Sequence, residues 1–527
     1  LAGGIFLFAC ANSTAVSPAS VPAPTTPPTT SVQSQKAPIV RTEAGDVEGV
    51  MERNVFAFKG IPYAAAPVGD LRWREPRPAA LWRGVRRANA YGNACIQVPG
   101  LSLENGGDPG PLSEDCLYLN VWTPRPDPSA RLPVMVWIHG GAYIFGAGGM
   151  DIYNGAPMAS KGAVVVNLNY RLMQLGFFAH PALERESPRG PANFGLLDQI
   201  AALRWVRENI AQFGGNPNNV TIFGQSAGGK SVLALFASPL ARGLFHKGIA
   251  QSTYALPDAT RAKALERGAN VADALGLRGA NASLAELRAA PAEKFGRLTG
   301  PELSHSPVPI SVDTVLPQSI EDTFAAGREA PLPLIVGNTS DDASVVVAFG
   351  VDPTELVKRL GAGGLFVKAL YPGVRDEAEL GRQAVRDLIF TMPVRRIADR
   401  HSKLAPVWRY YFDYTAVRLR PRFPNGVPHG GEIVYTLNTG DLSPGTKEIF
   451  TDADREYARR VSDYWFEFAR TGIPASRGGP LWPRDTGRQD KTMQFGNPMA
   501  VQTNFMRARL NIFIGGSKLL GGLLDRR

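Results

Sequence analysis

The sequence has few of the features that mark several large classes of protein. Its 527 residues include only three cysteines, too few for a disulfide scaffold or an array of zinc fingers. Beyond the first residues, no apolar run reaches the roughly 20 residues of a membrane-spanning helix. The 57 basic and 47 acidic residues leave a net charge of +10, but the excess is spread thinly and forms no basic stripe. We therefore expect no nucleic-acid partner and interpret the charge as a solvated surface.

The first 37 residues do not resemble part of a folded domain. Leu1 to Ala9 form a short apolar stretch that leads to Cys10, an order that resembles a bacterial lipoprotein signal with a lipidated cysteine. Residues 11–37 are rich in Pro, Thr and Ser, which predicts a disordered, semi-extended tether. We predict an exported protein, periplasmic or anchored to the outer membrane through Cys10. The alternatives are a plain cleaved signal with secretion, or an apolar start without a role.

Export also favours a disulfide between two of the cysteines. Cys95 and Cys116 lie 21 residues apart, and closing such a loop stabilises a fold by roughly 3 kcal/mol. The alternative is a pair of free, buried thiols.

The rest of the chain, residues 38–527, predicts a single domain with alternating strands and helices. Apolar positions in Leu197 to Phe213 recur at helical spacing, and Gly214 begins the turn that follows. Pro257 to Gly300 is also helical in pattern, and either covers a site or serves as scaffold. Continuous apolar strands between helices favour an α/β fold with a mostly parallel sheet covered on both faces. The expected buried strands are residues 134–138, 163–168, 220–223, 332–336 and 407–412.

A G-x-S-x-G motif supplies a candidate nucleophile. Gly224 to Gly228 directly follow one expected strand and precede a helix-like run, Ser231 to Phe236. This strand–turn–helix setting is the one in which such a motif presents a reactive serine, here Ser226. The two glycines relieve crowding in the tight turn, and the helix N-terminus lies beneath developing negative charge.

A second glycine-rich turn supplies candidate donors for an oxyanion. His139 to Ala142 follow a buried strand and precede the nucleophile in the chain, as a hole-forming loop does in this type of fold. Small residues let backbone N–H groups approach a tetrahedral intermediate. The N–H of Ala227, the residue after the nucleophile, adds a further donor.

The base and the acid are expected after the serine, in the order acid then base. Among the six histidines, His401 and His429 fit this order if the acid lies near residue 340. His401 lies in a charged helical segment and is expected to face solvent, whereas His429 lies in a glycine-rich loop and is favoured. The strand at 332–336 leads to Asp341 and Asp342, and spacing alone leaves both open as the acid.

With these motifs the chain resembles the type-B carboxylesterase family of the α/β-hydrolase superfamily, which includes cholinesterases and bacterial p-nitrobenzyl esterases. The resemblance extends from about Pro38 to Phe513 and rests on two long signatures, Glu114 to Pro124 and Phe213 to Gly228. Shorter similar segments are residues 58–64, 169–172 and 193–209. The resemblance implies an α/β-hydrolase fold, with a central, mostly parallel sheet flanked by helices and large helical insertions over the active site.

The resemblance also implies roles for individual residues. The family's serine and histidine fall on Ser226 and His429, and its acid, usually Glu, falls on Asp342. Its oxyanion donors fall on Gly141, Ala142 and Ala227, with Ala142 where many members have glycine. Its first disulfide falls on Cys95 and Cys116, and His139 is expected to be structural.

We therefore predict a serine carboxylesterase that hydrolyses small-molecule esters through an acyl-enzyme intermediate. No metal-ligand cluster or phosphate-binding loop is evident in the sequence, so neither a metal nor a cofactor is expected. One alternative is a catalytically silent binding or adhesion protein on the same fold. Another is a lipase, amidase or specialised detoxifying esterase with the same triad.

Overall fold

The computed structural model describes residues 38–104, 106–254, 258–298, 308–358 and 362–524. The predictions for residues 1–37, Cys10 included, lie outside the described residues. Over the described ranges, no helix combines the length and apolar character that crossing a membrane requires.

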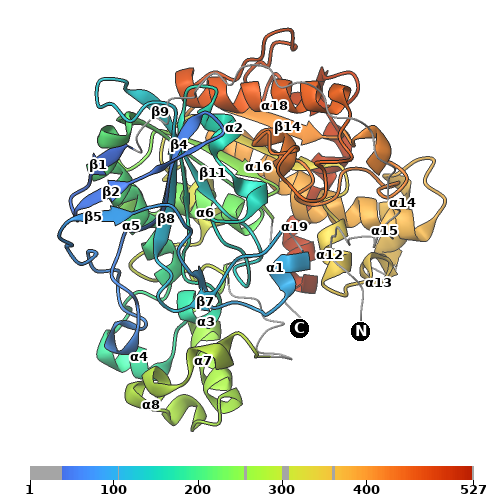
Figure 1. The fold of residues 1–527 in the computed structure, drawn as a ribbon. Coiled ribbons are helices and arrows are strands. Elements are labelled where there is room, and N and C mark those ends of the chain that lie inside the picture. The colour runs from blue at the N-terminus through green and yellow to red at the C-terminus, as the bar shows by residue number, and fades with distance from the viewer. Residues whose placement is uncertain (1–37, 105, 255–257, 299–307, 359–361, 525–527) are drawn as a thin grey trace, which may run out of the picture.

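A large twisted sheet forms the centre of the molecule (Figure 1). Its eleven strands follow the order β16-β15-β14-β13-β12-β11-β9-β10-β8-β4-β3. Every neighbouring pair from β15 to β10 is parallel, and the pairs at both edges are antiparallel. The central strands are β8 (Tyr118–Thr123), β9 (Leu132–Ile138), β10 (Val164–Leu168), β11 (Gly215–Gln225), β12 (Lys247–Gln251), β13 (Leu334–Thr339) and β14 (Val407–Phe412). The outer strands are β3 (Val50–Glu52), β4 (Val55–Pro62), β15 (Lys491–Phe495) and β16 (Ala500–Thr503).

The central strands are apolar throughout because both faces of the sheet are covered. In β9, Val134 and Val136 join one core cluster, whereas Met135 and Trp137 join a second cluster on the opposite face. The first face is covered by α5 (Phe194–Asn209) and α6 (Ala227–Ala237), and the second by α17 (Ile433–Thr436) and α18 (Asp452–Thr471). Burial on both sides explains why the alternating pattern of a half-exposed strand is missing.

The structure confirms the predicted fold class and the five predicted strands, which are β9, β10, β11, β13 and β14. The predicted helix at 197–213 is α5 followed by a 3-10 turn at Ile210–Phe213. The strand β12 was not predicted, because its apolar centre is short and is flanked by the polar residues Lys247 and Gln251. Lys247 bonds the Asn219 side chain, and Gln251 accepts a hydrogen bond from the Trp465 indole.

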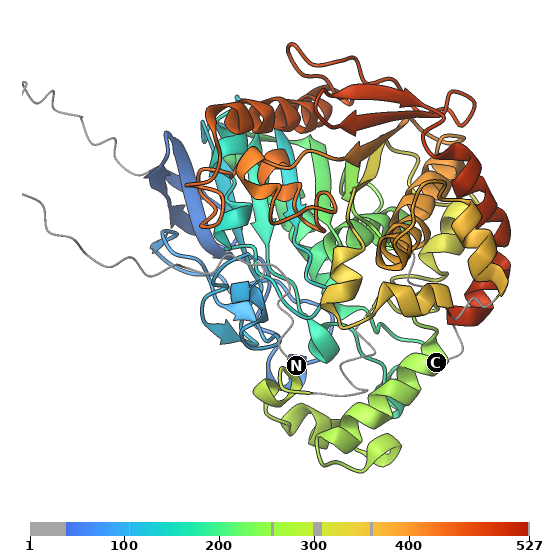
Figure 2. The ribbon, with the colours of Figure 1, turned by 90° about the vertical axis from the view of Figure 1, so that its right-hand side faces the viewer.

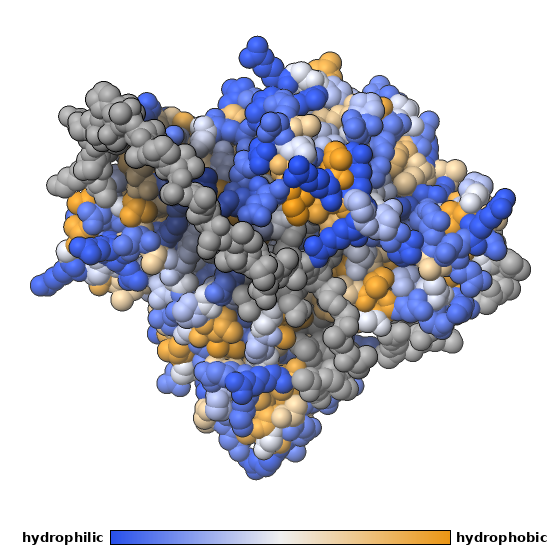
Figure 3. Space-filling model, turned by 45° about the vertical axis from the view of Figure 1, so that its right-hand side comes forward, coloured by the Kyte–Doolittle hydropathy of each residue, from blue (hydrophilic) through white to orange (hydrophobic). Residues whose placement is uncertain are grey.

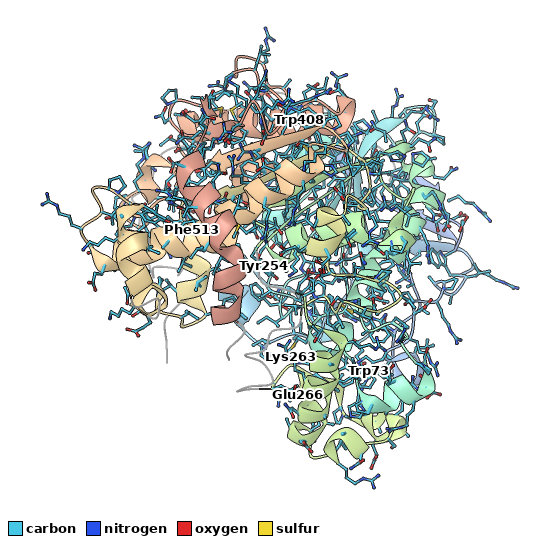
Figure 4. The ribbon with its side chains drawn as sticks, turned by 180° about the vertical axis from the view of Figure 1, so that it is seen from behind. Trp73, Tyr254, Lys263, Glu266, Trp408 and Phe513 are labelled. Carbon is cyan, nitrogen blue, oxygen red and sulfur yellow. A yellow bond between two sulfur atoms is a disulfide. The ribbon has the colours of Figure 1, made fainter. Side chains whose placement is uncertain are left out.

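Two groups of helices extend from the sheet. The segment predicted as helical at 257–300 contains α7 (Arg261–Ala274), α8 (Leu284–Ala289) and α9 (Ala292–Phe295), and in Figure 1 α7 and α8 lie in a lobe below the sheet. Trp73, labelled in Figure 4, attaches this lobe. Its ring lies 5.9 Å from that of Phe295 in α9 and 4.8 Å from that of Phe178, which precedes α7 in the chain.

The second group, between β13 and β14, lies beside the sheet in Figure 2. It contains α12 (Ser344–Ala348), α13 (Pro353–Lys358), α14 (Ala362–Ala369), α15 (Glu377–Arg386), a π-helical turn (Asp387–Thr391) and α16 (Met392–His401). The C-terminal helix α19 (Arg507–Leu524) packs against α16.

The face shown in Figure 3 is mostly hydrophilic, with apolar residues scattered among polar ones. Apolar residues that are exposed singly are common on soluble proteins and mark no site by themselves.

The expectation for His401 is wrong. His401 is fully buried, with Nδ1 2.9 Å from a carboxylate oxygen of Glu329 and Nε2 2.8 Å from the Leu332 carbonyl oxygen. The charged residues around it in sequence lie on other faces of α16. His401 therefore joins α16 to the chain that leads into β13, a structural role.

Candidate active site

Ser226 lies in a sharp turn between β11 and α6. Its backbone has φ 57° and ψ −122°, an unusual conformation for a residue other than glycine, and its side chain is nearly buried. A Cβ atom at Gly228 would lie 2.0 Å from the Ile138 carbonyl oxygen, and one at Gly224 would lie 2.5 Å from it. Both glycines are therefore required by the close approach of the end of β9, and the turn holds Ser226 at the carboxyl end of the sheet.

The loop after β9 runs directly against Ser226. A Cβ atom built on Gly140 would lie 3.2 Å from the Cβ of Ser226. Gly141, Ala142 and Tyr143 all have positive φ, at 96°, 51° and 61°. Since alanine and tyrosine rarely adopt this conformation, the loop stores backbone strain beside the nucleophile.

Hydrogen bonds to two carbonyl groups fix the direction of the N–H groups in this loop. The His139 Nδ1 lies 2.9 Å from the Gly140 carbonyl oxygen, and the N–H groups of Ile144 and Phe145 donate to the Gly141 carbonyl oxygen at 2.8 and 3.1 Å. A carbonyl and the N–H of the next residue share one rigid peptide plane. These bonds therefore orient the N–H groups of Gly141 and Ala142, two of the predicted oxyanion donors.

His139 contributes to the loop as a buried, neutral side chain. It is fully buried and stacks on Tyr170 at 4.4 Å between ring centres. Burial lowers the pKa of His139 to about 4, so the imidazole is neutral at physiological pH.

The structure brings His429 and Asp342 into direct contact. The His429 Nδ1 lies 2.7 Å from Asp342 Oδ1, and Asp342 Oδ2 accepts the backbone N–H of Thr339 at 2.8 Å. The His429 backbone N–H donates to Ser344 Oγ at 2.9 Å. Because a carboxylate can only accept, Nδ1 carries the proton and the lone pair of the imidazole lies on Nε2. Asp342 is fully buried, so this charge-assisted hydrogen bond is shielded from water.

Asp341, the second candidate acid, has a different environment. Its backbone pairs with the histidine loop, as the Asp341 N–H donates to the Val427 carbonyl oxygen at 2.9 Å. Burial raises the pKa of the Asp341 carboxyl to about 6, with a further contribution from the negative Asp342. The structure thus places Asp342, and not Asp341, against the imidazole of His429.

Gln225 joins the histidine loop to the turn that carries the nucleophile. Its amide Nε2 lies 3.2 Å from His429 Nε2, where an amide N–H can donate to the imidazole lone pair. Gln225 was not among the predicted site residues, although its place next to Ser226 in the turn could have suggested it.

Two further residues near His429 were also missed. Phe390, in the π-helical turn, packs on the imidazole at 5.4 Å between ring centres. Glu432 is fully buried, with Oε1 3.4 Å from both Gln251 Nε2 and Ser252 Oγ. Burial raises the pKa of Glu432 to about 8, and the charge of Asp342 adds to the effect. A buried acid three residues after a histidine gives no recognisable signal in a sequence.

Cys95 and Cys116 form a disulfide in the structure. The loop that it closes packs against the loop after β9, residues 139–146, because the Val98 N–H donates to the Ile144 carbonyl oxygen at 3.1 Å.

The fold and this arrangement of serine, histidine and acid at the carboxyl ends of parallel strands define an α/β-hydrolase. The sequence model of the family named "Carboxylesterase family" matches residues 36–362 and 375–513 of this chain. The chain is 36% identical over 501 residues to fumonisin B1 esterase of Sphingopyxis macrogoltabida, covering 88% of each chain. It is 37% identical over 466 residues to para-nitrobenzyl esterase of Bacillus subtilis (strain 168), covering 84% of this chain and 92% of that protein.

A solved structure titled PNB esterase superposes with a TM-score of 0.78 at 35% identity, covering 90% of this chain and 99% of the other. The chain therefore belongs to the carboxylesterase family, and it is a carboxylic ester hydrolase.

Proposed function

We propose that Ser226, His429 and Asp342 are the catalytic triad of this esterase. The observation that carries the proposal is the 2.7 Å contact between His429 Nδ1 and Asp342 Oδ1, which leaves Nε2 as a base beside the turn that holds Ser226. Ser226 Oγ attacks the ester carbonyl while His429 Nε2 accepts its proton. Asp342 holds the imidazole in the required tautomer and stabilises the imidazolium that forms.

The negative charge that develops on the carbonyl oxygen is held by the N–H groups of Gly141, Ala142 and Ala227. Ala227 is the first residue of α6, so the positive end of the helix dipole adds to the stabilisation. His429 then donates its proton to the leaving alcohol, and a water molecule repeats the cycle on the acyl-enzyme. No step of this cycle calls on a cofactor.

We further propose that residues 38–527 act as one catalytic domain of an exported enzyme, either periplasmic or anchored to the outer membrane. The apolar stretch before Cys10 and the Pro/Thr/Ser-rich composition of residues 11–37 support lipidation of Cys10 and a tether. The pairing of Cys95 with Cys116 also supports export, because disulfides persist in oxidising compartments. Lipidation is tested by mass spectrometry of the N-terminal peptide from membranes, with Cys10→Ala as control. Recovery of an unmodified peptide from the soluble fraction would contradict it.

The substrate class is tested with p-nitrophenyl esters from acetate to palmitate, using the wild type and Ser226→Ala side by side. We expect hydrolysis with a preference for short acyl chains, lost in the variant. An optimum at long chains would indicate a lipase instead. Equal, slow rates for both proteins on every ester would refute the nucleophile and leave a binding protein on the same fold.

A further inference from the structure

The loop after β9, residues 139–146, which carries the proposed donors Gly141 and Ala142, is bound by the side chain of Gln97, which is 1% exposed. The Gly146 N–H donates to Gln97 Oε1 at 3.0 Å, and Gln97 Nε2 donates to the Gly146 carbonyl oxygen at 3.1 Å. One amide thus pairs with both backbone groups of one residue at the end of the loop. Gly146 has φ 114°, so this residue also adopts a conformation that favours glycine.

Two more contacts fix the orientation of the Gln97 amide. Its Nε2 also donates to the Cys95 carbonyl oxygen at 3.0 Å, and its Oε1 accepts the hydroxyl of Ser102. Every donor therefore meets an acceptor, and a flipped amide would place like groups against each other at the three backbone contacts. Cys95 is joined to Cys116, so Gln97 lies within the loop that this disulfide closes, two residues from the bridge.

The position of Gly146 bears directly on the two candidate donors. The turn from Gly141 to Gly146 is closed by bonds from Ile144 and Phe145 to the Gly141 carbonyl oxygen, and these bonds orient the N–H of Ala142. Three residues of this turn have positive φ before Gly146 is reached. A strained turn keeps one conformation only where its surroundings constrain it.

We propose that Gln97 is a positioning residue for the oxyanion hole, holding Gly146 so that the N–H groups of Gly141 and Ala142 face the reacting carbonyl. The inference rests on the proposed function and extends it to a residue outside the triad and the hole. Without the Gln97 amide, the peptide planes of the loop can rotate, and a donor turns away from the oxyanion. Binding of the substrate before reaction does not depend on this contact.

The test compares Gln97→Met with the wild type. Methionine keeps the volume of the side chain but makes none of the four hydrogen bonds. Losing one donor of an oxyanion hole lowers the rate by roughly 10²–10³. Loss of the Gln97 amide misaligns a donor only part of the time, so kcat is expected to fall by about 10- to 100-fold. KM for a short p-nitrophenyl ester is expected to stay within about threefold, because ground-state binding is retained. The affinity for a trifluoromethyl ketone, whose serine adduct carries an oxyanion, is expected to fall in parallel with kcat.

Asn209→Leu is the matched control for the loss of a buried amide. Asn209 is 2% exposed, and its amide accepts from the Glu43 N–H and donates to the Trp205 carbonyl oxygen. It lies at the end of α5 that leads into β11, at the opposite end of the strand from Ser226. This control is expected to lower the melting temperature while leaving kcat and ketone affinity unchanged.

A Gln97→Met enzyme with wild-type kcat and ketone affinity would overturn the inference, as would a change confined to KM. If Gln97→Met does not fold, Ser102→Ala removes one support of the same amide and is expected to lower kcat in the same direction by a smaller factor. An unchanged kcat and ketone affinity in that variant would equally overturn the inference. Fluorophosphonate labelling of the wild type tests the proposed function separately. If Ser226 is labelled but Gln97→Met keeps wild-type kcat and ketone affinity, only the role of Gln97 is refuted.

Discussion

Replacement of Asp342 by asparagine is predicted to abolish most of the activity without disturbing the fold. The new amide can still accept the Thr339 N–H through its carbonyl oxygen, which then turns the NH₂ group toward His429 Nδ1. Nδ1 must now accept a hydrogen bond, so the proton moves to Nε2, and the proposed base loses the lone pair that would accept the Ser226 proton. The corresponding replacement in a serine protease triad lowers kcat by about 10⁴, which is about 5 kcal/mol of transition-state stabilisation.

The neighbouring Asp341→Asn variant is the control. Asp341 is also a carboxylic acid, one residue away, but it does not contact the imidazole through any hydrogen bond between described residues. The variant is expected to keep kcat within a fewfold. Both variants are measured on a short p-nitrophenyl ester at about pH 8, with circular dichroism to confirm folding. Equal losses in the two variants, or a larger loss in Asp341→Asn, would refute the assignment of Asp342.

Three further outcomes are expected. Ala142→Gly should raise the free energy of unfolding by about 1 kcal/mol with kcat retained, because the left-handed backbone at φ 51° suits glycine; a loss of stability in denaturant titration would contradict this. Burial raises the pKa of Glu432 from 4.5 to about 8 on folding, so the free energy of unfolding should fall as pH rises from about 5 to 8. Glu432→Gln should flatten the dependence of melting temperature on pH, and an unchanged slope would argue against a buried neutral acid. Reducing the Cys95–Cys116 bridge, which spans 21 residues, should cost roughly 3 kcal/mol in urea unfolding, and no shift with reductant would refute this.

Residues with a short-range signature could be placed from the sequence. The turn at Ser226 is defined by glycines two residues away on either side, and the strand and helix that it joins are adjacent in the chain. The parallel strands were predictable because burial on both faces makes them continuously apolar. A buried strand need not be continuously apolar where a polar side chain finds a hydrogen-bond partner, as Lys247 of β12 does with Asn219. Such strands are missed when only apolar runs are sought.

Residues that depend on distant partners could not be placed in this way. Asp341 and Asp342 are neighbours in the same turn, and only the path of the histidine loop distinguishes them. His401 has charged neighbours in sequence, but its partner Glu329 lies 72 residues away and allows it to be buried. The link from Gln97 to Gly146 spans 49 residues, so only the folded chain makes it visible.

The most direct test of Ser226 as the nucleophile is the site of covalent labelling by a fluorophosphonate. The wild type and Ser226→Ala are treated with the reagent, and the intact mass and the modified peptide are determined for each. We expect a single adduct on Ser226 in the wild type and none in the variant. An adduct on another residue, or labelling of Ser226→Ala at the wild-type rate, would contradict it.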